Sequence, residues 1–253
     1  MGLRRILKNF LYRSKYKIKK NQLAPLKELS YLITGANSGI GLALTKEILN
    51  QKNKVIATYR KDNKKLLEIK DNNLQILECN QENVDDIEEI KNFIKDKPIN
   101  IIINAAGIGD WKEQTFENID YNFFQKMLMI NSLSIIKLSE IIIKYSQKNS
   151  LKIILNITST MGSISLNNSG NSFIYRVSKS TLNSVTKNMS IDLKNRFNIN
   201  VFAVCPGSIK TKMNPDGLVN PEVCSKNILN IVNGFDEKLN GKFIDVSNKE
   251  IPW

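Results

Sequence analysis

The chain has 253 residues and a net charge of +13, and 42% of its residues are hydrophobic, enough for one buried core. It contains no histidine, which excludes Ser-His-Asp and Cys-His catalysis and His-ligated zinc. Its three cysteines are far apart and no apolar run approaches a membrane span, so we expect no disulfide framework, no metal site and a cytoplasmic protein.

The first segment, residues 1–28, contains nine Lys or Arg and one acidic residue. Apolar residues recur in it at helical spacing: Leu3, Ile6, Leu7, Phe10 and Leu11. We therefore predict a basic amphipathic extension. Three alternatives stay open: residues 1–20 lie on an anionic membrane surface, pack on a protein surface, or form a targeting peptide that is removed. Only Tyr12 and Tyr16 are available there to stack on bases, so we expect no specific nucleic-acid binding.

From Leu29 onward, short runs rich in Ile and Val alternate with stretches of helical periodicity. The predicted strands are 29–33, 54–59, 74–78, 99–103, 151–157, 200–205 and 242–246. The predicted helices lie near 40–52, 62–70, 84–96, 120–148, 174–197 and 221–234. Several strands are apolar without alternation, as in a parallel sheet covered on both faces. Residues 29–253 are thus predicted to form one Rossmann-type α/β domain, a doubly wound parallel sheet of about seven strands, with its ligand at the C-terminal strand ends.

The first predicted strand runs into the sequence TGANSGIG and then into a helix. Its glycines permit a tight turn and a close backbone approach, so the N–H groups that begin the helix can face a phosphate. The predicted cofactor contacts in this turn are Gly35, Asn37, Ser38, Gly39, Ile40 and Gly41. The spacing TGxxxGxG resembles the cofactor turn of the short-chain dehydrogenase/reductase family.

The residues after the second and third strands bear on the choice of cofactor. An NAD enzyme usually places an acidic residue after the second strand, where it binds the ribose 2′-OH and repels a 2′-phosphate. This chain has Arg60 there, a cation that favours NADP(H), while Asp62 two positions later keeps NAD open. Asn80 stands where the resemblance implies an Asp near the adenine, and its amide oxygen can still accept a hydrogen bond.

Further motifs follow in the order of that family, each after a predicted strand or on a predicted helix. Asn104-Ala105-Ala106-Gly107 resembles the family's NNAG segment, and the later motifs supply Asn131, Ser159, Tyr175, Lys179 and Pro206-Gly207. The runs YRVSK and PGSIKT, with the ending EIPW, are similar to the C-factor/Sniffer-like carbonyl reductase branch. The resemblance extends from residue 30 to 253 and does not include the basic extension.

Tyr175 and Lys179 form the best acid/base pair that a chain without histidine offers. They are four residues apart on a predicted helix and so share one face, where an ammonium can stabilise a phenolate. A free tyrosine titrates near 10, so this assistance matters for proton transfer at neutral pH. Ser159 lies three residues before a glycine, as the family's serine does, and Thr158 and Thr160 remain alternatives to it.

The resemblance implies a role for each of these residues. Tyr175 would donate a proton to the carbonyl oxygen during reduction, and Ser159 would hydrogen-bond the same oxygen. Lys179 would bias Tyr175 and also hold the hydroxyls of the nicotinamide ribose. Asn131 would anchor a proton-relay water at an interruption of the helix 120–148.

The remaining contacts and the substrate pocket are also implied by the resemblance. The cofactor contacts at the later strand ends are Asn104, Ala105, Ala106, Gly107, Tyr175, Lys179, Pro206, Gly207, Ile209 and Thr211. Three stretches are expected to shape the substrate pocket: Ile108–Asn118, Gly162–Phe173 and Ser208–Asn220. Apolar walls are expected from Trp111, Phe173 and Met213.

Together these features indicate an NADPH-dependent oxidoreductase that reduces a small-molecule ketone or aldehyde to an alcohol. The alternative is an NADP(H)-binding regulatory or signalling protein with weak activity, held at a membrane surface by its basic extension. The helices 120–148 and 174–197 are expected to offer an interface for a homo-oligomer.

Overall fold

The computed structural model describes residues 26–109 and 115–253, so the predicted amphipathic extension and Trp111 lie outside the described residues. The described strands form one parallel sheet in the order β3-β2-β1-β4-β5-β6-β7. Their bounds are β1 Ser30–Thr34, β2 Lys54–Tyr59, β3 Leu74–Glu78, β4 Ile101–Asn104, β5 Ile153–Ile157, β6 Asn200–Cys205 and β7 Phe243–Asp245. Each overlaps a predicted strand, and the predicted Rossmann-type fold class is confirmed.

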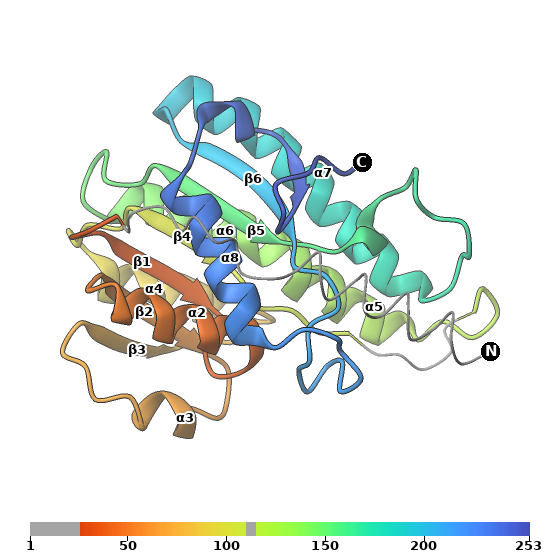
Figure 1. The fold of residues 1–253 in the computed structure, drawn as a ribbon, viewed down its shortest axis with the longest axis horizontal. Coiled ribbons are helices and arrows are strands. Elements are labelled where there is room, and N and C mark those ends of the chain that lie inside the picture. The colour runs from red at the N-terminus through yellow and green to blue at the C-terminus, as the bar shows by residue number, and fades with distance from the viewer. Residues whose placement is uncertain (1–25, 110–114) are drawn as a thin grey trace.

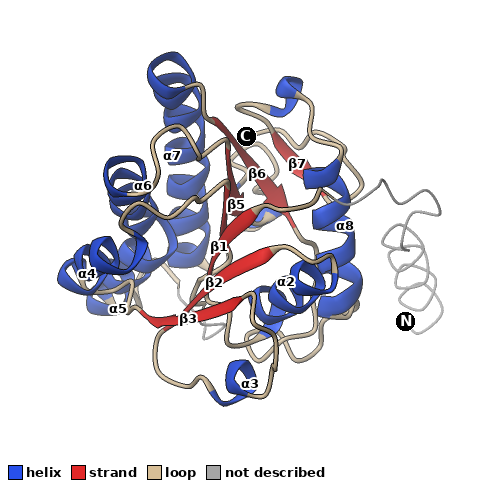
Figure 2. Cartoon of the chain, turned by 90° about the vertical axis from the view of Figure 1, so that its left-hand side faces the viewer, coloured by secondary structure: helices blue, strands red, loops and turns tan. Residues whose placement is uncertain are grey.

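Helices cover both faces of this sheet (Figures 1 and 2). Helices α2 and α8 pack against each other on one face, while α4, α5, α6 and α7 lie on the other. Their bounds are α2 Gly39–Asn50, α4 Val84–Ile94, α5 Tyr121–Leu128, α6 Ser134–Tyr145, α7 Phe173–Phe197 and α8 Pro221–Asn233. Short helical turns are α3 Lys64–Leu67, η2 Thr160–Gly162 and η3 Glu237–Leu239, and a π-helix, η1 Met129–Leu133, joins α5 to α6.

The strands are apolar on both faces because each face is buried against helices. Along β1, Tyr31 and Ile33 pack in the same cluster as Leu44 of α2. Leu32 between them packs in the opposite cluster with Ile90 of α4. Neighbouring side chains on a strand point to opposite faces, so a strand of this kind has no polar alternation.

The strand order reverses at β1, which pairs with β2 on one side and with β4 on the other. The chain therefore leaves the C-terminal ends of β1 and β4 in opposite directions, and a crevice opens between them. This is the predicted location of the ligand.

Two predicted helices differ from the structure. The helix predicted over 62–70 is helical only in α3, and beyond it Asp71 accepts a hydrogen bond from the Asn73 N–H where the chain turns toward β3. The helix predicted over 120–148 is divided by the π-helix η1, where an interruption at Asn131 was expected. None of the helices in the described residues combines the length and hydrophobicity needed to span a bilayer.

Candidate active site

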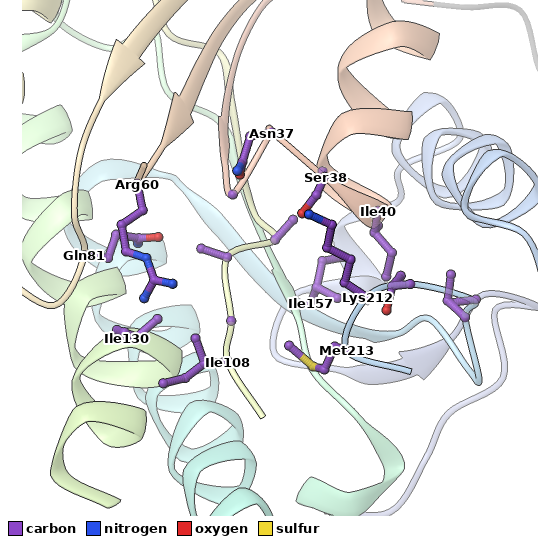
Figure 3. A pocket seen from close by; sticks show the side chains of 18 of the residues that line it. Asn37, Ser38, Ile40, Arg60, Gln81, Ile108, Ile130, Ile157, Lys212 and Met213 are labelled. Atoms are coloured by element: carbon purple, nitrogen blue, oxygen red, sulfur yellow. The ribbon is translucent and has the colours of Figure 1, made fainter. Parts of the chain in front are cut away.

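The predicted site residues converge on one cavity of about 510 Å³ at the C-terminal strand ends (Figure 3). Those that line it are Gly35, Asn37, Ser38, Gly39, Ile40, Gly41, Arg60, Asn80, Ala105, Ala106, Gly107, Ser159, Tyr175, Lys179, Pro206, Gly207, Ile209 and Thr211. Asn104 and Asn131 are buried and do not line it. No group of three or more His, Cys, Asp or Glu within the described residues could hold a metal ion.

The glycine turn between β1 and α2 forms one wall of the cavity by close backbone packing. Gly35 has a φ of +64°, and a Cβ there would lie 2.7 Å from the Ala106 Cα. A Cβ on Gly41 would lie 2.3 Å from the Gly35 carbonyl oxygen. Ser38, the N-cap of α2, makes no capping hydrogen bond with its side chain, and the first turn contains no acidic residue. The backbone N–H groups of the first turn of α2 therefore remain available to donate hydrogen bonds to an anion in the cavity.

The end of β2 carries the predicted selectivity residue. Arg60 is exposed, its side chain points into the cavity (Figure 3), and no ion pair to it is found among the described residues. Asp62, the residue that kept NAD open, also borders the cavity, but its carboxylate accepts a hydrogen bond from the Lys64 N–H at 3.1 Å. The Asn80 Oδ1 accepts from the Glu82 N–H at 3.3 Å. Arg60 is thus the group best placed for a phosphate here.

Asn131 joins the loop after β4 to helix α7. Its Oδ1 accepts a hydrogen bond from the Ile108 N–H at 2.8 Å, and its Nδ2 donates to the Ile108 carbonyl at 2.9 Å. Nδ2 also donates to the Ser178 hydroxyl at 3.0 Å, which in turn donates to the Tyr175 carbonyl at 2.8 Å. Because a π-helix widens the turn at this point, the amide reaches both neighbours. Its expected part in a proton relay stays a prediction.

Tyr175 and Lys179 lie on the cavity side of α7, one turn apart. The Lys179 Nζ is 5.9 Å from the centre of the Tyr175 ring and donates a hydrogen bond to the Ile157 carbonyl at 3.1 Å. The Tyr175 hydroxyl is hydrogen-bonded to the Ser159 hydroxyl. Two segments that are separate in sequence, the end of β5 with the turn after it and helix α7, thereby bring an acid, a cation and a hydroxyl together.

Of the three hydroxyl candidates after β5, Ser159 is the one that contacts Tyr175. The Thr158 hydroxyl is buried and donates to the Asn183 Oδ1 at 2.8 Å. Thr160 is exposed and does not line the cavity. The geometry therefore favours Ser159 over both alternatives.

Burial shifts the pKa values of the acid and the cation in opposite directions. Desolvation raises the pKa of Tyr175 well above its ordinary value; the nearby Cys205 adds to this rise and the hydrogen bond to Ser159 opposes it. Desolvation lowers the pKa of Lys179 to about 8, against an opposing effect of Cys205. At neutral pH the pair is therefore a phenol beside an ammonium, which can donate a proton and stabilise the phenolate left behind.

Several lining residues were not singled out as contacts by the motifs. They are Tyr59, Lys61, Cys79, Gln81, Ile108, Ile130, Ile157, Lys212 and Asn214. Cys79 and Gln81 could have been found from their place beside Asn80, and Lys212 from its place beside Thr211. Of the expected apolar walls, Met213 lines the cavity, whereas Phe173 does not line it and packs behind it in a cluster with Met127, Ile174 and Tyr175.

Comparisons with known proteins agree with this architecture. The short chain dehydrogenase family matches residues 30–218. The C-signal protein of Myxococcus xanthus is 28% identical over 158 residues, which are 62% of this chain and 93% of that protein. The carbonyl reductase Sniffer of D. melanogaster has a TM-score of 0.81 at 28% identity, over 89% of this chain and 100% of its own. A Burkholderia multivorans short-chain dehydrogenase/reductase with bound NADP shares the fold, with a TM-score of 0.79 at 21% identity over 89% of this chain and 100% of its own.

Proposed function

The chain belongs to the short-chain dehydrogenase family, in its C-factor/Sniffer-like branch, and from that premise we propose that it reduces a ketone or aldehyde to an alcohol with NADPH. The observation that carries the proposal is the hydrogen bond between Tyr175 and Ser159 beside the Lys179 ammonium. Tyr175, Ser159 and Lys179 line the same cavity as the glycine turn between β1 and α2. Such an arrangement suits proton donation to a bound carbonyl oxygen.

The described residues fit a dinucleotide. The uncapped N-terminus of α2 borders the cavity and can hold the pyrophosphate. The cation of Arg60 suits a 2′-phosphate, which supports NADP(H), as does the NADP in the Burkholderia relative. When bound, the nicotinamide supplies the hydride.

The protein's own part is to orient the carbonyl and deliver a proton. Ser159 donates a hydrogen bond to the carbonyl oxygen and holds it near the Tyr175 hydroxyl. Tyr175 is protonated at neutral pH because burial raises its pKa, so it gives its proton to that oxygen as negative charge develops. The Lys179 ammonium stabilises the phenolate that remains, and its low-dielectric surroundings strengthen this attraction.

The direct test is to titrate the full chain with NADPH and NADH, and then to follow NADPH consumption with a panel of aldehydes and ketones. We expect NADPH binding and turnover of at least one carbonyl. Tyr175→Phe should lower kcat by about 10²–10⁴-fold with little change in NADPH affinity, because only the phenolic proton donor is lost. Tyr121→Phe, at an exposed tyrosine outside the cavity, is the matched control. Full activity in Tyr175→Phe would refute the assigned acid.

The similarity to C-signal supports a second candidate, an NADP(H)-binding signalling protein with weak activity. The same experiment separates the two. Binding of NADPH without turnover across the panel would favour the signalling protein, and absence of binding would contradict both.

A further inference from the structure

Lys212 extends from the loop between β6 and α8 into the cofactor cavity. Figure 3 shows its side chain running beside Ile40 toward Ser38, the N-cap of α2. Lys212 thus lines the same cavity as Ser38 and Ile40, at the N-terminus of that helix. Within the described residues it forms no ion pair.

The loop that carries Lys212 is held in place by its own hydrogen bonds and by the glycine turn. Thr211 and Asn214 bond reciprocally through their backbones at 3.1 Å, and the Asn214 Nδ2 donates to the Ser208 hydroxyl at 3.1 Å. A Cβ on Gly39 would lie 3.1 Å from the Thr211 Cγ2, so the loop packs directly on the turn. The backbone of Lys212 is thus positioned, and only its side chain remains free to adjust.

The charges around this point favour an anion. The N-terminus of a helix carries a partial positive charge, and the first turn of α2 contains no acidic residue to balance it. Lys212 adds a full positive charge at the same place. Asp62 is the only acidic residue among the described residues that line the cavity; it lies on the loop after β2, and its carboxylate accepts a hydrogen bond from the Lys64 N–H. Two positive groups that face each other across a cavity repel unless an anion lies between them.

We propose that Lys212 binds the pyrophosphate of the dinucleotide and holds it against the N-terminus of α2. This inference rests on the proposed function, since it assigns one more residue to the same site. Helix α2 then contacts the pyrophosphate through backbone N–H groups, and Lys212 contacts it as a charged donor from the opposite wall. The loop after β6 thereby serves cofactor affinity.

The chemistry of the two cofactors separates Lys212 from Arg60. NADPH and NADH share the pyrophosphate, whereas only NADPH has the 2′-phosphate. Loss of the Lys212 charge should therefore weaken both cofactors by the same factor. Loss of the Arg60 charge should weaken NADPH selectively.

The test measures the dissociation constants of NADPH and NADH for the full chain by calorimetry. Lys212→Gln should raise both by about tenfold, equivalent to about 1.4 kcal/mol, and should reduce the dependence of binding on salt. The matched control is Lys210→Gln, which removes the same charge from the same loop at a position that does not line the cavity. It should leave both constants within about twofold of wild type, because its charge makes no direct contact with a nucleotide bound in the cavity and is screened by salt. Circular dichroism should show unchanged folding in both variants.

Three results would overturn the inference while leaving the proposed function standing. The first is wild-type affinity for both cofactors in Lys212→Gln. The second is a loss confined to NADPH, which would assign Lys212 to the 2′-phosphate. The third is an unchanged cofactor affinity with a raised KM for the carbonyl, which would assign it to the substrate. Failure of the wild-type chain to bind either nucleotide would overturn the proposed function together with this inference.

Discussion

The two ends of the cofactor cavity are built in contrasting ways. At one end, Tyr175 and Lys179 are buried and are held by hydrogen bonds that extend to Asn131. At the other end, Arg60 and Lys61 are exposed on the loop after β2. Proton transfer needs desolvated groups with shifted pKa values, whereas recognition of a phosphate needs only a cation within reach. The first end should therefore tolerate little change, and the second should be easy to alter.

The largest effect on binding is expected from a charge reversal at the exposed end. Arg60→Asp should raise the NADPH dissociation constant by about 100-fold and change that of NADH by less than about threefold, because a carboxylate repels only the 2′-phosphate. Fluorescence titration with both cofactors measures this. Equal weakening of NADPH and NADH would show that Arg60 does not face the 2′-phosphate.

A large effect on stability is expected at the buried end. Asn131→Ala removes hydrogen bonds to Ile108 and Ser178 and should lower the free energy of unfolding by about 2 kcal/mol, since buried partners lose their donor or acceptor. Arg60→Ala, the matched change at the exposed end, should stay within about 0.5 kcal/mol of wild type. Urea unfolding of both variants measures the difference. Equal free energies of unfolding in Asn131→Ala and Arg60→Ala would contradict the contrast between the two ends of the cavity.

The pH dependence of activity should also depend on the buried end. The pKa of Lys179 is lowered to about 8, so its ammonium is present below that pH and is lost as the pH rises through it. Tyr175 stays protonated over the same range because its own pKa is raised. We expect kcat/KM for NADPH to be level below pH 8 and to fall by about tenfold per pH unit above it, because the group must be protonated. A profile that rises above pH 8 would contradict this assignment.

The smallest effect on the cavity is expected from the basic extension. Deletion of residues 1–24 should leave kcat and KM unchanged. The same deletion should release the protein from vesicles that contain anionic lipid, because the extension is expected to bind their surface. Co-sedimentation with anionic and neutral vesicles measures the binding. Equal sedimentation of the deleted and full chains would contradict the membrane hypothesis, and loss of folding would show that the extension packs on the domain.

Much of the fold and the site could be predicted because the signals are local. Periodicity over a few residues places every described strand, since burial on both faces demands continuous apolar residues. The spacing from Tyr175 to Lys179 places both on one face of α7, and the interruption at Asn131 is the π-helix η1. The helix predicted over 62–70 is present but shorter, since α3 ends at Leu67 and the chain then turns at Asp71 toward β3.

The amino-acid sequence by itself therefore determined the order of strands and helices, the glycine turn, and the residues proposed as the acid and its cation. Only the tertiary structure decided which hydroxyl meets Tyr175 and that Lys212 extends into the cavity that the start of α2 borders. It also decided the shifted pKa values of Tyr175 and Lys179. The physical reason is that desolvation and contact depend on distances between segments far apart in the chain, and no local pattern encodes such distances.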